Sequence, residues 1–246
     1  FYESQTPVEQ AHIAAAFRFE LSKVTVPAIR ERMVASLRNA SESLALQLAT
    51  QLGMPEVPKA LPLALQQRVK PEVQKSPALS LMARPGNGSI AGRKVAIFVA
   101  AGVEWAALAP VQAALVSAGA AVRLVGPYIG PLASAEGEAV DADASLENEP
   151  AFLFDGLVLP GGEPAVKALA ADAHAIEGVA NVYRHCKPML VMPASVALLN
   201  AAGIKPQAAD SGLVMATADT GQAIAAFVKA LGGPRAFERE TDPPRV

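Results

Sequence analysis

The chain has 246 residues, a mass of 25.4 kDa and a formal net charge of −2, with 52% hydrophobic and 18% charged residues. This composition is typical of one large or two small globular domains with a buried core, and it excludes a disordered chain. A charge so close to neutral gives no support for a nucleic-acid partner. No apolar run reaches the roughly 18 residues that a membrane-spanning helix needs. We therefore expect neither a nucleic-acid nor a membrane partner.

The single cysteine, Cys186, excludes an internal disulfide and a cysteine-rich zinc site. It fits a reducing compartment, so we expect a cytoplasmic protein. The only histidines are His12, His174 and His185, which leave little material for a metal site. The chain begins at Phe1 without a methionine, and we expect either a processed protein or a piece of a longer one.

Residues 1–53 are predicted to form a small α-helical region. Thr6-Pro7-Val8-Glu9 is a helix start, with Thr6 as the cap and Glu9 at the capping-box position. Apolar residues then recur every three or four positions, which predicts one buried stripe. That stripe consists of Ile13, Phe17, Leu21 and Val24. A second helix is predicted from Pro27, and a third opens at Ser41 or Ser43 and ends at Gly53.

The second predicted helix would place Ile29, Met33 and Leu37 on its inner face. Three helices on so short a stretch bury little surface by themselves, so we expect the region to pack on another part of a protein. Residues 54–92 form a long proline-rich linker in which regular structure is not expected to run far. Its prolines are Pro55, Pro58, Pro62, Pro71, Pro77 and Pro85.

From residue 93 onward, strands and helices alternate. Apolar runs of strand length occur at 94–100, 121–125, 155–160, 188–192 and 213–215. Helices are predicted at about 105–118, from 163 to about 186, through Leu198 and Leu199, and at about 221–231. This alternation predicts an α/β domain over 93–236, with a parallel sheet covered by helices on both faces. Residues 237–246 are assigned to a C-terminal tail.

Glu104 directly follows the first strand of this domain, where open parallel sheets place their sites. A carboxylate there could act as a general base or as a hydrogen-bond partner for a nucleophile. The alternative is a negative charge favoured by the dipole at a helix N-terminus. The turn Gly161-Gly162 follows another strand. Its backbone N–H groups could bind an anion. The alternative is that the turn needs glycine because its backbone adopts a positive φ.

Ser195 is the only hydroxyl in the loop after the 188–192 strand, where a nucleophile elbow would lie. No Gly-x-Ser-x-Gly pattern surrounds it, so capping of the following helix is the alternative interpretation. Cys186 lies before that strand and beside His185. Adjacent residues of a helix point in different directions, which favours a structural cysteine over a catalytic pair.

Two stretches resemble known families. Residues 1–24, from Phe1-Tyr2-Glu3-Ser4-Gln5-Thr6-Pro7 onward, resemble the helical region that follows the haem-binding barrel of monofunctional haem catalases, and this similarity extends over about 50 residues. From Arg93 onward the chain resembles the DJ-1/PfpI-like domain, which has a flavodoxin-like sheet. The segments that carry this second resemblance are Pro160-Gly161-Gly162, Lys187-Pro188 and 198–203.

The DJ-1/PfpI resemblance places Glu104 where that family keeps a glutamate facing its nucleophile. The family's cysteine would fall at Met192 or Pro193, and neither is a cysteine. Hydrolase or thiol-redox activity is therefore not expected. No catalytic residue is assigned, and Glu104 and Ser195 remain only vestigial candidates.

The order of the two parts resembles the C-terminal part of a large-subunit catalase. The resemblance implies that the parent protein disproportionates hydrogen peroxide with a haem held upstream, and that this chain binds no cofactor or metal. The implied partners are the upstream haem barrel and the other subunits of a homotetramer. The implied role is non-catalytic: it would stabilise the subunit and the tetramer and shape substrate access. The alternative is a DJ-1/PfpI-like module with holdase or vestigial hydrolase activity.

Overall fold

The computed structural model describes residues 1–63, 73–84, 86–206, 209–217, 220–244 and 246. The chain divides into two compact units, Phe1–Arg84 and Pro85–Val246. Pro71 and Pro85 of the predicted linker lie outside the described residues.

The first unit contains three α-helices, as the sequence predicts. They are α1 (Pro7–Ser22), α2 (Pro27–Leu37) and α3 (Glu42–Gln51), preceded by the 3-10 helix η1 (Tyr2–Ser4). The capping box at the start of α1 is confirmed, because the Thr6 hydroxyl accepts from the Glu9 N–H and the Glu9 carboxylate accepts from the Thr6 N–H. Of the two serines considered for α3, Ser41 is the cap and accepts from the N–H of Leu44.

The inner face predicted for α2 is wrong at two positions. Ile29 and Met33 are 46% and 41% exposed, whereas Val34 and Ala35 are buried. Successive residues of an α-helix are rotated by about 100° around its axis, so a shift of one position turns the buried face away from Met33. The residues buried in this unit's core are Ala14, Leu21, Val34, Leu44, Ala45, Leu48 and Ala49.

The described residues after α3 run along this first unit with little regular structure. The Arg38 guanidinium donates to the carbonyl of Pro58, and the Asn39 amide donates to the carbonyl of Leu61, each at 2.8 Å. Two 3-10 helices follow, η2 (Pro77–Leu79) and η3 (Leu81–Ala83).

The second unit contains a six-stranded parallel sheet in the order β5-β2-β1-β6-β7-β8. Its strands are β1 (Lys94–Phe98), β2 (Ala121–Gly126), β5 (Ala144–Ser145), β6 (Gly156–Leu159), β7 (Met189–Val191) and β8 (Leu213–Met215). Without the two-residue β5, this is the order of the flavodoxin-like doubly wound fold. The predicted fold class is therefore confirmed.

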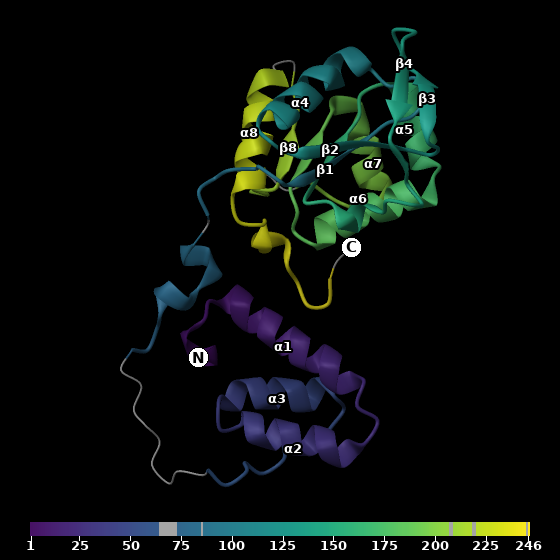
Figure 1. Ribbon diagram of the computed structural model, residues 1–246. Coiled ribbons are helices and arrows are strands. Elements are labelled where there is room, and N and C mark those ends of the chain that lie inside the picture. The colour runs from purple at the N-terminus through teal and green to yellow at the C-terminus, as the bar shows by residue number, and fades with distance from the viewer. Residues whose placement is uncertain (64–72, 85, 207–208, 218–219, 245) are drawn as a thin grey trace. The chain divides into compact units, whose positions relative to one another are not determined.

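Helices cover both faces of the sheet (Figure 1). Helices α4 (Trp105–Ser117) and α8 (Thr220–Gly232) lie together on one face. The other face carries α5 (Glu163–Ala170), α6 (Ala173–Arg184) and α7 (Val196–Ala201). This two-sided cover explains why the central strands are apolar at every position, with Val95 to Phe98 fully buried.

Two local features differ from the predictions. The single helix expected from residue 163 to about 186 is two helices, because the Asp172 carboxylate caps α6 and accepts from the N–H groups of His174 and Ala175. An antiparallel hairpin of β3 (Gly130–Ala133) and β4 (Ala139–Ala142), also seen in Figure 1, was not predicted.

The short 3-10 helices η4 (Ala151–Leu153), η5 (Pro193–Ser195) and η6 (Phe237–Arg239) complete the unit. In the part of the chain that the structure describes, no helix is both long and apolar enough to cross a membrane.

Candidate functional site

The carboxyl ends of β1, β6 and β7 bring both candidate residues to the same turn, Pro160-Gly161. Glu104 follows β1 and donates its N–H to the carbonyl of Gly161 at 3.3 Å. Ser195 follows β7, and its hydroxyl donates to the carbonyl of Pro160 at 2.5 Å. Two of the sequence-selected residues therefore lie at one edge of the sheet, as a parallel fold requires.

The Ser195 hydroxyl is not arranged as a nucleophile. The residue is fully buried, and its hydrogen is committed to a backbone carbonyl. An attacking hydroxyl needs access to substrate and a neighbouring base that can accept its proton. Ser195 stands at the N-cap position of α7, but its side chain makes no capping bond. Its hydroxyl instead joins the start of α7 to the end of β6.

The position of the nucleophile elbow has ordinary backbone geometry. Met192 has φ −69° and ψ 153°, which is extended backbone, and its side chain is buried. A nucleophile elbow is a strained turn that exposes its side chain. Among the described non-glycine residues, only Cys186 has a positive φ, and it lies before β7 rather than after it.

Two glycines at this edge let the loops after β1 and β6 pack directly on each other. A Cβ on Gly162, which has φ +95°, would lie 2.2 Å from the carbonyl oxygen of Gly102. A Cβ on Gly161 would lie 2.4 Å from the Glu104 carboxylate. Both glycines are therefore needed for close approach of the β1 and β6 loops. Doubly wound folds usually bind ligands at this edge of the sheet.

The N-terminus of α4 is capped by a residue that the sequence analysis did not select. The Glu136 carboxylate, from the turn of the β3–β4 hairpin, accepts from the N–H groups of Trp105 and Ala106 at 3.1 and 3.3 Å. Hydrogen bonds from its own N–H and from Ala106 and Trp105 lower the pKa of Glu136. Glu104 makes no side-chain capping bond. A capping residue 30 and 31 positions away from the N–H groups that it accepts from leaves no local signal in the sequence.

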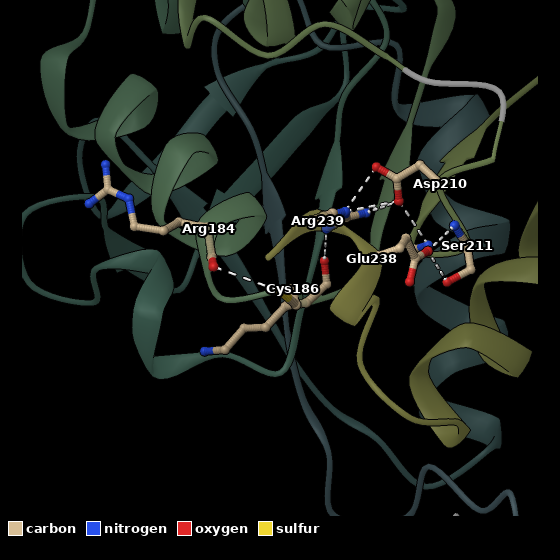
Figure 2. Close-up of polar contacts among 8 residues, drawn as sticks. Arg184, Cys186, Asp210, Ser211, Glu238 and Arg239 are labelled. Atoms are coloured by element: carbon tan, nitrogen blue, oxygen red, sulfur yellow. Dashed lines mark hydrogen bonds and ion pairs between the residues drawn. The ribbon is translucent and has the colours of Figure 1, made fainter. Parts of the chain in front are cut away.

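A second polar cluster, also missed from the sequence, lies at the amino ends of the strands. Figure 2 shows the Arg239 guanidinium directed at the Asp210 carboxylate, with Ser211 and Glu238 beside them. The ion pair is 2.7 Å long, and its side chains are 2% and 3% exposed. The guanidinium also donates to the carbonyl of Lys187 at 2.7 Å. The cluster joins the segment after α8 to the loop before β8, through Asp210 and Ser211, and to the loop before β7, through Lys187.

Cys186 is buried beside this cluster, and its thiol is held in the unreactive protonated form. Its thiol lies 3.8 Å from the carbonyl of Arg184 (Figure 2). Burial raises the pKa of Cys186 to about 11, so the thiol is protonated at neutral pH. Its backbone has φ +57° and terminates α6, since its own N–H and that of Lys187 donate back to carbonyls of the helix.

Three side chains that could in principle ligate a haem, those of Cys186, Tyr128 and His185, do not fit that role. A haem needs an axial ligand inside a closed, largely apolar pocket. The Cys186 thiol is buried and protonated, and Tyr128 is 76% exposed. His185 lines an open pocket, but Lys187 and Arg235 line it too. The described residues also contain no group of three His, Cys, Asp or Glu side chains that could hold a metal ion.

Comparisons with known proteins match the chain in two stretches. Residues 1–52 match the family described as catalase-related immune-responsive, and residues 91–241 match the C-terminal domain found in long catalases. Catalase HPII of Pseudomonas putida is 39% identical over 241 residues, which are 98% of this chain and 32% of that protein. Catalase C of Rhizobium meliloti is 39% identical over 240 residues, 98% of this chain and 33% of that protein.

A third relative, Catalase HPII of Mycobacterium avium, is 34% identical over 98% of this chain and 35% of its own length. The chain thus spans about a third of the length of these curated relatives. It belongs to the long-catalase family, and its residues 91–241 form the C-terminal domain found in those proteins.

Proposed function

We propose that this chain is the C-terminal part of a large-subunit haem catalase that disproportionates hydrogen peroxide to water and oxygen in the cytoplasm. The observation that carries the proposal is the order of the two family matches along one chain, together with an identity of 39% to relatives about three times as long. The haem would be held by an upstream barrel, because the donors described above do not fit it. The single buried Cys186 is in keeping with a reducing compartment.

Within that protein the segment carries no peroxide chemistry and instead stabilises the subunit, contributes to a homotetramer and shapes substrate access. Support comes from the helical unit, where several large apolar side chains are exposed. Among them are Phe19, Val26, Ile29, Met33 and Leu46. Soluble proteins rarely leave so much apolar surface uncovered, so an upstream domain and neighbouring subunits are the proposed cover.

The test begins with the coding sequence and with mass spectrometry of the native protein. Both should place a haem barrel before Phe1. In the full-length enzyme, deletion of residues 85–246 should leave the haem absorbance and the initial peroxide turnover, while the tetramer dissociates at lower temperature or denaturant concentration. Immediate loss of turnover, with haem and tetramer intact, would contradict a non-catalytic segment.

Glu104 and Ser195 are proposed to be structural remnants of a hydrolase-like site. The support is the buried Ser195 hydroxyl, which donates to a carbonyl, and the packing of Glu104 on Gly161. Any hydrolysis of p-nitrophenyl acetate or consumption of glyoxal by the chain should be unchanged in Glu104→Gln and Ser195→Ala. A large fall in either rate, in a variant that stays folded, would restore the enzyme hypothesis.

A holdase is the second candidate, favoured by exposed apolar residues on the α/β unit. Tyr128 and Ile129 are 76% and 67% exposed between β2 and β3. A holdase needs such surface to capture unfolded chains. The chain at equimolar ratio should then suppress thermal aggregation of citrate synthase, and Tyr128→Ser/Ile129→Ser should suppress it less. An equal effect of the variant, or no suppression by the parent chain, would exclude this role.

A further inference from the structure

The α/β unit has a pocket at the edge of the sheet opposite to Glu104 and Ser195. Its volume is about 350 Å³, within the range of small-molecule sites. The residues that line it are Phe152, Asn181, His185, Lys187 and Arg235. Phe152 belongs to η4, which precedes β6, and Lys187 precedes β7, so the pocket lies at the amino ends of these strands.

Three of the five lining residues carry cationic or protonatable nitrogen, and none is a carboxylate. The Lys187 ammonium is held in place by the carbonyls of Phe152 and Phe154, at 2.7 and 2.6 Å. An ammonium has three N–H groups, so one remains for another acceptor. Within the described residues, the Arg235 guanidinium makes only a long bond of 3.5 Å, to the carbonyl of His185. Both cationic side chains therefore keep donors that can bind another acceptor at this pocket.

The charges near the pocket repel one another. Burial lowers the pKa of His185, and the positive charges of Lys187, Arg235 and Arg184 lower it further. Burial and Arg235 also lower the pKa of Lys187, and Asp155 opposes this. A bound anion would relieve this repulsion and would accept hydrogen bonds from groups whose positions are already fixed.

Phe152 adds an apolar wall to this cationic pocket. Its side chain is 51% exposed, although it belongs to a packed 3-10 helix. An inorganic ion would leave that ring in water, whereas an organic anion would cover it. At the carboxyl edge, the loops after β1 and β6 pack directly on each other at Gly102 and Gly162. The pocket beside Phe152 lies at the opposite, amino-terminal edge of the sheet.

We propose that the pocket between η4, the end of α6 and the segment after α8 binds a small organic anion. Its phosphate or carboxylate group contacts Arg235, Lys187 and His185, and its apolar part lies on Phe152. This site does not depend on peroxide chemistry. It would remain a binding site even if the proposed catalase function were disproved.

The test is NMR titration of the histidine ring protons in the 246-residue chain, at an ionic strength fixed with sodium chloride. The probes are phenyl phosphate and benzoate, with inorganic phosphate and acetate as the partners that lack a ring. The His185 signals should move with saturation, and the pH midpoint of His185 should rise, because a bound anion favours the imidazolium. His12 and His174 do not line the pocket and are internal controls, whose ring signals should not move with added probe.

Variants separate the site from general charge effects. Arg235→Gln should weaken phenyl phosphate binding by about tenfold, since a charge-assisted contact is lost. Arg32→Gln removes the same charge from the exposed surface of the other unit and should change nothing. Phe152→Ala should abolish the preference of the site for phenyl phosphate over inorganic phosphate.

Three results would overturn the proposal. The first is no saturable movement of His185 with either ring-bearing probe at millimolar concentration. The second is equal binding by the Arg235→Gln and Arg32→Gln variants. The third is that inorganic phosphate and acetate bind as tightly as phenyl phosphate and benzoate. The site would then be a cluster of cations that binds any anion.

Discussion

Arg239 and Asp210 are joined by a 2.7 Å ion pair that is almost completely removed from solvent. The pair is not isolated, because Arg239 also donates to the carbonyl of Lys187 and its guanidinium lies 4.5 Å from the centre of the Tyr183 ring. Charges buried in this way are tolerated only when their hydrogen bonds are satisfied.

Removal of one partner of this pair should be costly. Arg239→Met leaves the Asp210 carboxylate buried without its cation, and we expect the free energy of unfolding to fall by about 3–5 kcal/mol. Urea unfolding measures this change. Arg123→Gln, which breaks the more exposed pair with Glu149, is the control and should cost less than about 1 kcal/mol. The double replacement Arg239→Met/Asp210→Leu should lose less than Arg239→Met alone, and a larger loss would contradict the explanation.

The closed loop contact at the carboxyl edge can be tested with a pair of glycines. Gly162→Ala adds a Cβ that would meet the carbonyl of Gly102 at 2.2 Å, and the backbone has a positive φ as well. Gly203 also has a positive φ, but nothing lies within 4 Å of its added Cβ. Gly203→Ala should therefore cost only about 1 kcal/mol, for the left-handed backbone, and Gly162→Ala clearly more. Equal melting temperatures for the two variants would show that the loops are not in contact.

Ser195→Ala should lower the free energy of unfolding by about 1–2 kcal/mol, because the buried carbonyl of Pro160 loses its donor. The matched control is Ser22→Ala. Its hydroxyl donates to the carbonyl of Arg18 on the exposed surface, and its removal should change stability by less than about 0.5 kcal/mol. If both variants unfold at the same urea concentration, the Ser195 bond has no structural role.

Cys186 should be slow to react with thiol reagents in the folded chain. A pKa of about 11 leaves about a hundredfold less thiolate at pH 8 than an ordinary cysteine has. Ellman's reagent should therefore react at least 100 times faster with the chain in urea than with the native chain. Rapid stoichiometric labelling of the native protein would contradict the burial of this thiol.

The same raised pKa links stability to pH. Between about pH 9 and pH 11 the unfolded chain releases the thiol proton and the folded chain keeps it, so stability falls as the pH rises. The loss attributable to Cys186 should reach about 2 kcal/mol at the upper end. Cys186→Ala lacks this contribution, so the difference between the two pH profiles measures it. Parallel profiles for the two proteins would contradict it.

The sheet could be predicted from the sequence because its central strands, such as Val95 to Phe98, are apolar on both faces. The β3–β4 hairpin could not, since Gly130-Pro131-Leu132-Ala133 lacks the β-branched residues that mark a strand. The break between α5 and α6 was missed because Asp172 was not recognised as a cap inside an apolar run.

The two polar clusters were missed for a different reason. Arg239 and Asp210 are 29 positions apart, and Glu136 caps a helix that begins 31 positions before it. Charged residues are usually exposed, so only the fold shows which of them are buried or act as caps. By contrast, Glu104 and Ser195 could be placed at one edge from strand order alone. The burial of the Ser195 hydroxyl depends on the turn at Pro160, which the sequence pattern does not specify.

The strands at the two ends of the parallel sheet are very short. β5 contributes two residues and β8 contributes three. An outer strand with few free backbone groups is a poor template for pairing with another chain. This geometry should disfavour edge-to-edge strand pairing between two copies of the α/β unit.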